Sequence, residues 1–234
     1  MPPLPDLVAR VLYRDSLLLV LDKPAGLPVH AGPGGGPNLE QGFDSLRFGL
    51  PRPPGLAHRL DRDTSGCLAL GRHPKALRKL GKLFQEGRVE KTYWAVVANC
   101  PPEDSGVVEA PLFKQSNPRG GWRMVINPQG QPAVTGWRVL GRGDGLTWMA
   151  FYPRTGRTHQ IRVHAASLGC PLLGDPQYGG PADAPLHLHA KQLILPLYPS
   201  RAPVTVAAPV PAHMQDALRR CGWRPEMDAA KTSN

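Results

Sequence analysis

The sequence predicts an α+β domain built on a mixed, largely antiparallel sheet. Short aliphatic, β-branched or aromatic runs recur along the chain between turn residues, whereas few segments have the period of a helix. Many short strands with few helices are typical of this class. Neither an internal repeat nor a linker interrupts the pattern. We therefore predict one domain over residues 1–234, with an ordered core over about 10–222, a loose N-terminus and a loose C-terminal tail.

Apolar runs and turn residues place the expected strands. Strands are expected over residues 11–13, 17–21, 91–98, 134–140, 146–152, 186–197 and 204–207. The glycine-rich stretch 141–145 is expected to turn the chain between two paired strands, and 101–106 is expected to be another turn. The polar stretch from Lys114 to Gly121 is expected to form a long hairpin loop that reaches a substrate.

The clearest helix is expected from Pro74 to Glu86. Proline suits its first position and Gly87 suits its stop. Apolar residues fall on one face, and the rest of the surface is basic, with Lys75, Arg78, Lys79 and Lys82. A basic helix face is usually only solvated, but beside a candidate catalytic loop this one is suited to contact phosphates of a polyanion.

A second helix is expected from Thr158, whose hydroxyl suits an N-cap, to Leu168, with Gly169 as its stop. On that helix Arg162 lies one turn in, on the same face as the cap. A third, short helix is expected over residues 212–220.

The charge of the chain favours a polyanionic partner. The formal net charge is +10 at pH 7 and the sequence pI is about 9.8, although a merely soluble basic surface is the alternative. The cysteines form no C-x-x-C pair, which argues against a zinc or redox site and suits a reducing cytoplasm. The N-terminus lacks the pattern of a signal peptide, and no apolar run is long enough to span a bilayer. We expect a cytoplasmic protein without membrane attachment.

Neither a metal nor a nucleotide cofactor is expected. His187 and His189 would share a strand face, but the sequence suggests no third ligand for a metal. The glycine-rich stretch 32–37 lacks both the G-x-G-x-x-G spacing and a following Gly-Lys-Ser/Thr, so it is not a phosphate loop.

The most unusual stretch runs from His58 to Gly66 and reads H-R-L-D-R-D-T-S-G. Only Leu60 is an obvious core residue, and a buried charge must be paired or costs several kcal/mol. The apolar residues 55–57 and 67–70 flank the stretch, which predicts a charged loop held between packed elements. Binding and catalytic residues are commonly presented in this way, although a solvated turn is the alternative.

Four segments together resemble the RluA family of RNA pseudouridine synthases. Residues 58–66 match that family's H-R-L-D-x-x-T-S-G motif, and residues 22–30 resemble its K-P-A-G-x-x-V-H motif. Residues 90–95 resemble its K-x-Y strand, and residues 155–164 resemble its G-R-T-H-Q-I-R-V-H motif. The resemblance implies a long bent sheet of two halves with flanking helices and a central active-site cleft. One departure from the family is expected: because the first motif begins about twenty residues from Met1, we expect a single catalytic domain without the N-terminal accessory RNA-binding domain of many members.

The resemblance implies a role for individual residues in the isomerisation of uridine to pseudouridine. Asp61 maps onto the family's nucleophile, Arg162 onto the arginine that pairs with it, and Tyr93 onto the tyrosine that stacks on the target base. Arg59 is expected to replace the flipped base in the RNA. Substrate contacts are expected from Arg59, His58, Arg62, Thr64, Arg157, His159, Gln160 and Lys91. The implied partner is structured RNA, with no cofactor and no protein partner, and the chain is expected to act as a monomer.

Several alternatives stay open at the level of the sequence. Asp61 is suited to attack the sugar, to attack the uracil, or to stabilise an unsaturated sugar intermediate. Arg157 is the alternative partner for it, and Tyr93 alone would be read as a core aromatic. Other classes are a non-catalytic RNA-binding protein with the same fold and a hydrolase that uses Asp61 with Asp63. The target, in ribosomal RNA, transfer RNA or both, also stays open.

Overall fold

The computed structural model describes residues 4–32, 35–99, 101–116 and 121–228. These residues group into two compact units. The first unit comprises residues 4–90 and 190–209, and the second comprises residues 91–189 and 210–228. The expectation of one functional domain over the whole chain stays a prediction, and each unit is described by itself.

The first unit is built on a sheet in which β1, β2, β4 and β11 follow one another. Its strands are β1 (Val11–Arg14), β2 (Leu18–Lys23), β3 (Gly55–Leu56), β4 (Ser65–Gly71), β11 (Leu188–Leu195) and β12 (Val204–Ala207). β3 pairs antiparallel with β4, and β12 pairs antiparallel with β11. Every residue of β4 is buried, because both faces of this strand are covered. The strands expected at 11–13, 17–21 and 204–207 are confirmed.

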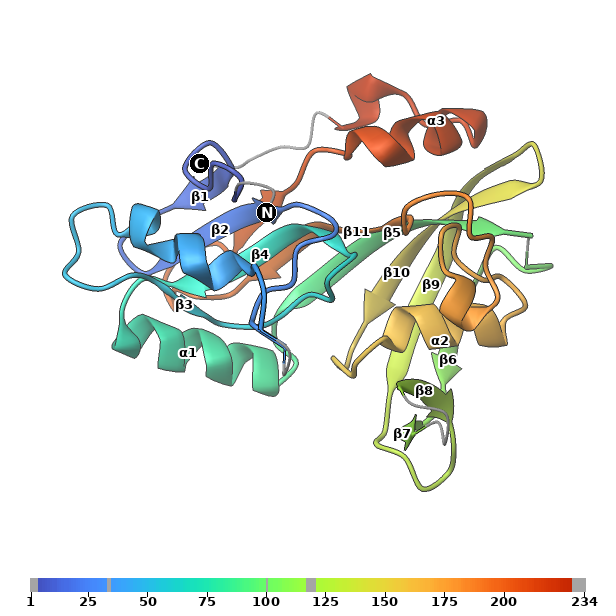
Figure 1. Ribbon diagram of the computed structural model, residues 1–234, viewed down its shortest axis with the longest axis horizontal. Helices are drawn as coiled ribbons and strands as arrows, with labels where there is room; N and C mark the ends of the chain where they lie inside the picture. Colours follow the sequence, from blue (N-terminus) through green and yellow to red (C-terminus); the bar gives the residue numbers. More distant parts are fainter. Residues whose placement is uncertain (1–3, 33–34, 100, 117–120, 229–234) are drawn as a thin grey trace. The chain divides into compact units, whose positions relative to one another are not determined.

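Helix α1 (Pro74–Gln85) packs beside β4 in the first unit (Figure 1). Its predicted start and stop are confirmed, since Pro74 occupies its first turn and Gly87 has a φ of 66°. A Cβ on Gly71 would lie 2.6 Å from the Leu77 Cα, so only glycine permits this close approach. Its expected basic residues Lys75, Arg78, Lys79 and Lys82 are exposed. A 3-10 helix, η1 (Leu39–Leu46), completes the unit and had no clear signal in the sequence.

The second unit contains a sheet in which β5, β10, β9 and β6 follow one another, each antiparallel to the next. The strands are β5 (Glu90–Ala98), β6 (Ser105–Glu109), β9 (Val134–Gly143) and β10 (Leu146–Pro153). The expected turn over 141–145 is too long, because Asp144 and Gly145 alone make it, with φ values of 52° and 73°. The expected turn at 101–106 overlaps β6, whose residues pair with β9.

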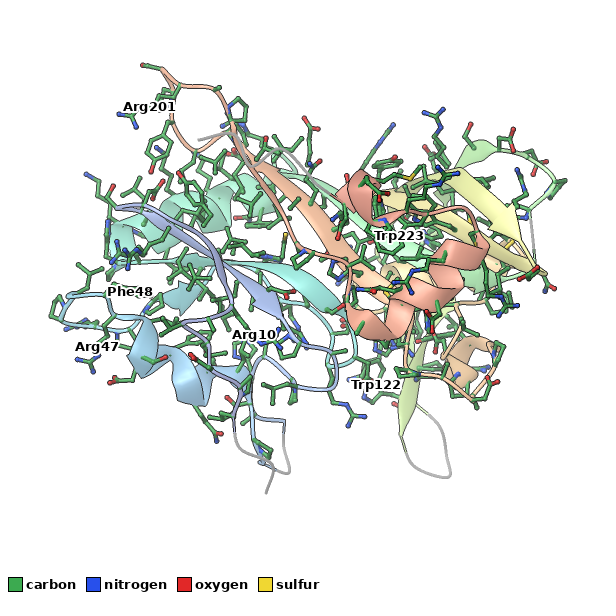
Figure 2. The ribbon with its side chains drawn as sticks, turned by 90° about the horizontal axis from the view of Figure 1, so that it is seen from above. Arg10, Arg47, Phe48, Trp122, Arg201 and Trp223 are labelled. Carbon is green, nitrogen blue, oxygen red and sulfur yellow. The ribbon has the colours of Figure 1, made fainter. Side chains whose placement is uncertain are left out.

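The core of the second unit joins β5 and β10 to helix α3 (Ala212–Arg220). Met214 and Leu218 of α3 pack there with Trp148 and with Trp223, which Figure 2 labels next to the helix. The helix expected over 212–220 is confirmed. A final 3-10 helix, η3 (Pro225–Asp228), follows it.

A separate two-stranded hairpin extends the second unit (Figure 1). It consists of β7 (Leu112–Ser116) and β8 (Trp122–Ile126), and it packs against helix α2 (Gln160–Ser167) and the 3-10 helix η2 (Pro176–Tyr178). The loop expected from Lys114 to Gly121 is therefore part strand, and its residues 117–120 lie outside the described residues.

Helix α2 begins two residues later than expected. Thr158 is not its cap, because His159 precedes the helix in the left-handed region, with a φ of 53°. The reason is the side chain of Gln160, whose Oε1 accepts hydrogen bonds from the Thr155 hydroxyl and the Arg157 N–H. These bonds hold the preceding residues in a turn and replace the expected N-cap.

Candidate active site

The charged stretch 58–66 runs through the connection from β3 into the first residues of β4 in the first unit, so the loop expected between packed elements is present. Its backbone is held at several points. The Thr64 N–H donates to the Asp61 carbonyl at 3.2 Å and closes a turn over the aspartate. His58 Nε2 accepts from the Ala69 N–H at 2.9 Å, and its ring stacks on Phe84 of α1 at 4.3 Å. The loop is thus fixed at both ends.

A buried lysine supplies the central anchor of this loop. Lys23 is fully buried, and its Nζ donates to the carbonyls of Pro24, Leu27 and Arg62 at 2.7, 2.8 and 2.9 Å. Burial lowers the pKa of Lys23 to about 8, against the raising effect of nearby acidic groups, first among them Asp63. The ammonium group therefore ties the segment 22–30 to the loop residue that follows Asp61.

The side chains of the loop are less confined than its backbone. Asp61 is half-buried, and Thr64 is buried. Arg62 is exposed and makes an ion pair of 3.2 Å with Asp63. Arg59 is exposed, and no hydrogen bond or ion pair joins it to another residue in the described part of the chain. Its guanidinium group faces solvent, in a position to meet a ligand.

Arg162 lies in α2 of the second unit and is held by a residue that sequence reasoning missed. Its Nε donates to Asp175 Oδ2 and its Nη2 donates to Asp175 Oδ1, both at 2.7 Å. Arg162 is 9% exposed and Asp175 is 1% exposed, so this is a buried bidentate pair. Asp175 precedes Pro176 at η2, and no spacing in the sequence links it to the arginine.

Three aromatic rings lie around this arginine pair. The Arg162 guanidinium stands over the Tyr178 ring, 4.9 Å from its centroid. The Tyr178 hydroxyl is hydrogen-bonded to His159 Nδ1 at 2.7 Å, and the His159 ring stacks on Trp122 at 5.1 Å. Tyr178 was not predicted as a site residue, since a lone tyrosine in a turn carries no signal of its own.

The remaining predicted residues of the segment 155–164 have structural partners. Gln160 is 4% exposed, and all four hydrogen-bonding positions of its amide are occupied, because its Nε2 also donates to Val134 O and Thr135 Oγ1. Arg157 is half-buried, and its Nε donates to the Pro132 carbonyl at 3.1 Å. Arg157 and Arg162 therefore have different surroundings, and the preference for Arg162 as the partner of Asp61 stays a prediction.

Two predicted residues lie on β5. Tyr93 is 9% exposed and pairs in register with Phe151 of β10. The Nζ of Lys91 donates to the Thr155 carbonyl at 3.2 Å, and burial lowers the pKa of this lysine to about 8. Lys91 is thereby linked to the segment that leads into α2.

Metal and membrane features are absent from the described residues. Within residues 4–32, 35–99, 101–116 and 121–228, no group of three or more His, Cys, Asp or Glu is placed to hold a metal ion. His187 Nδ1 donates to the Pro185 carbonyl at 2.7 Å, and its ring meets His213 edge-on at 5.5 Å. No helix in the described part of the chain is both long and apolar enough to cross a bilayer.

Comparison with known proteins places this arrangement in a family. Residues 17–167 match the model of the RNA pseudouridylate synthase family. An uncharacterised RNA pseudouridine synthase of Zymomonas mobilis is 45% identical over 217 residues, which cover 91% of this chain and 99% of that protein. The ribosomal large subunit pseudouridine synthase C of Vibrio cholerae is 36% identical over 90% of this chain and 68% of its own length.

Solved structures agree with the sequence relatives. The human RNA pseudouridylate synthase domain containing 4 superposes with a TM-score of 0.77 and 29% identity, over 92% of this chain and 94% of that one. The human domain-containing-1 protein superposes with a TM-score of 0.74 and 26% identity over the full length of both chains. The expected α+β pseudouridine synthase fold is confirmed. The chain belongs to the RNA pseudouridylate synthase family, resembles its RluA-type members, and is therefore an RNA isomerase.

Proposed function

We propose that this pseudouridine synthase modifies uridines in structured ribosomal or transfer RNA, with Asp61 as its nucleophile. The observation that carries the proposal is the anchored loop. The backbone beside Asp61 is fixed by the Thr64 N–H and by the ammonium of Lys23, whereas the carboxylate is half-buried. A nucleophile held in this way loses little conformational freedom when it attacks.

The proposed reaction needs only side chains. The glycosidic bond between C1′ of the ribose and N1 of uracil breaks, the uracil rotates, and a bond forms between C1′ and C5. The C5 proton leaves, N1 gains a proton, and no electron is transferred to or from the substrate. Asp61 acts either on the sugar or on the uracil, or it stabilises the sugar intermediate between the two bonds.

We propose that Arg162 keeps Asp61 ionised during catalysis. A carboxylate in a dry site is driven towards protonation unless a cation holds it charged. The bonds to Asp175 and Gln177 engage Nε and Nη2 of Arg162 and hold its guanidinium group in place. The fork held by Asp175 orients that group. Tyr93 is proposed to stack on the target base.

The other predicted residues divide into contacts and supports. Exposed Arg59 is proposed to fill the gap that the flipped uridine leaves, and exposed Arg62 and half-buried Arg157 are proposed to contact the RNA backbone. His58 and Gln160 are already engaged by protein groups, which favours a supporting role for both. Thr64, Lys91 and His159 stay proposed contacts.

The names of relatives favour ribosomal RNA as the first target to test. The Vibrio cholerae relative is named for the large ribosomal subunit, and we propose the same class of RNA here, with transfer RNA as the alternative. We further propose that the chain acts in the cytoplasm as a monomer, without a cofactor or protein partner.

The test combines a pseudouridine map with product analysis. RNA from cells with and without the gene is mapped across all transcripts, and purified protein is incubated with RNA tritiated at C5 of uridine. We expect sites that vanish with the gene, and tritium that appears in water while no free uracil is released. Free uracil would identify a hydrolase, and RNA binding without tritium release would identify a non-catalytic RNA-binding protein.

A further inference from the structure

The side chain of Gln177 bridges the β7–β8 hairpin and Arg162. Its Nε2 donates to the Trp122 carbonyl of β8 at 3.1 Å, and its Oε1 accepts from Arg162 Nη2, also at 3.1 Å. One amide therefore bonds the backbone of a strand on one side and the guanidinium group on the other. Gln177 is exposed, so it does not contribute to the packing of the hydrophobic core.

Tyr178 makes a second, parallel bridge. Its hydroxyl accepts the Met124 N–H of β8 at 3.1 Å, and its ring lies beneath the Arg162 guanidinium at 4.9 Å. Both bridges start from the backbone of β8, at residues two apart, and both end on the same arginine. The Trp122 ring, labelled in Figure 2, adds a stack on His159, which is itself bonded to the Tyr178 hydroxyl.

We propose that Gln177 and Tyr178 are positioning residues that transmit the position of the β7–β8 hairpin to Arg162. The inference rests on the proposed role of Arg162 in catalysis. Asp175 fixes the guanidinium plane from the buried side, and the two bridges fix it from the hairpin side. A displacement of about 1 Å at a reacting centre is enough to slow a reaction substantially.

In this proposal the β7–β8 hairpin does more than stabilise the fold of the second unit. Trp122 is 40% exposed and Phe113 is 42% exposed, and the Lys114 Nζ stands over the Trp122 ring at 4.7 Å. A ligand that presses on this hairpin would move β8, and the two bridges would carry that movement to Arg162. The hairpin would then adjust the rate of the chemical step separately from RNA affinity.

Two variants cut the bridges at the hairpin and leave the contact with Arg162. Tyr178→Phe keeps the ring beneath Arg162 but removes the hydroxyl that accepts the Met124 N–H and is bonded to His159. Gln177→Glu keeps an oxygen that accepts from Arg162 but cannot donate to the Trp122 carbonyl. Gln177→Met cuts both ends, and Gln129→Met changes an equally exposed glutamine in the turn after β8 as the matched control.

The measurement is the single-turnover release of tritium from total RNA tritiated at C5 of uridine, taken from cells that lack the gene. We expect Tyr178→Phe and Gln177→Glu each to lower the rate constant about tenfold. The RNA concentration for half-maximal rate should stay within about twofold, and the melting temperature should be unchanged. Gln129→Met should behave as wild type.

Two results would overturn the inference. Wild-type rate constants for Tyr178→Phe and Gln177→Glu, with a defect only in Gln177→Met, would show that Gln177 merely holds the arginine locally. A loss of RNA affinity with an unchanged rate constant would show that these residues contact RNA. Absence of tritium release by the wild-type protein would instead refute the proposed function, so the two failures are distinguishable.

Discussion

The loop that carries Asp61 and the segment that carries Arg162 are held in opposite ways. In the loop, hydrogen bonds fix the backbone, through Lys23 and the Thr64 N–H, while the guanidinium group of Arg59 faces solvent. In the α2 segment, hydrogen bonds fix the side chains themselves, with Arg162 clamped by buried Asp175.

The difference follows from what each segment is proposed to do. Cations that bind RNA must keep their water until the RNA arrives, because burying them unpaired would cost several kcal/mol. A cation that tunes one carboxylate must instead have one orientation, and a bidentate carboxylate provides it. Backbone anchoring therefore positions Asp61 while it leaves Arg59 and Arg62 exposed to RNA, and side-chain anchoring gives Arg162 one orientation.

The largest effect is expected from Asp61→Asn. The substitution keeps size and shape but removes the charge of the nucleophile, so isomerisation should fall by several orders of magnitude. RNA affinity should stay within about threefold, because phosphate contacts dominate it. Single-turnover kinetics and a filter-binding titration measure the two quantities. Retained turnover would remove Asp61 from the reaction.

Arg162→Met should cost about a hundredfold in turnover, since one preorganised charge is lost from the site. Without the cation the negative charge of Asp61 would lose the partner proposed to stabilise it. Asp175→Asn keeps the guanidinium charge but weakens its fork, and a smaller loss is expected. A pH–rate profile of each variant checks that Arg162→Met loses more turnover than Asp175→Asn. Greater damage from Arg157→Met would mean that the pair is assigned to the wrong arginine.

Arg59→Ala should lower the rate of isomerisation only on RNAs in which the target base must be flipped out of a helix. On an RNA whose target uridine is paired, the activation free energy should rise by the cost of unstacking the base, about 2 kcal/mol. On the same RNA opened at that uridine, most of the rate should return. Arg62→Ala, an equally exposed arginine of the same loop, should show one penalty on both RNAs. Equal defects of Arg59→Ala on both would mean that it organises the loop.

The smallest effect is expected from the titration of Lys23, whose pKa burial lowers to about 8. Below that pH its ammonium has three N–H groups for three carbonyls, whereas the neutral amine has only two. Turnover should therefore fall a few-fold between about pH 7.5 and 9. Lys23→Met should be slower throughout and lack this alkaline decline, whereas Lys91→Met should retain it.

The direction in which stability changes with pH distinguishes the alkaline decline in turnover from unfolding. The pKa of Lys23 in the folded protein lies below the ordinary lysine value of 10.5. The unfolded chain therefore binds more protons between about pH 8 and 10.5, and the contribution of Lys23 to stability rises over that interval. A melting temperature that drops in parallel with turnover would contradict a local loosening of the loop.

Local signals in the sequence sufficed wherever neighbours along the chain decide the structure. Pro74 and Gly87 bound α1 because each acts on its own backbone conformation. The alternating runs placed β9 and β10, although Asp144 and Gly145 make a shorter turn than expected. The family and the fold also followed from short motifs, because each keeps its residues within a few positions of one another.

Only the tertiary structure decided how those motifs are held. Asp175 clamps Arg162 from 13 residues away, and Lys23 anchors a carbonyl 39 residues away, at Arg62. Thr158 does not cap α2, because Gln160 Oε1 holds the preceding turn while Gln160 Nε2 is bonded to β9. Such bonds form between elements that fold side by side. Their partners can lie at any distance along the chain, so the sequence does not reveal them. The sequence therefore determined which residues are proposed to carry the chemistry, and tertiary packing determined what orients them.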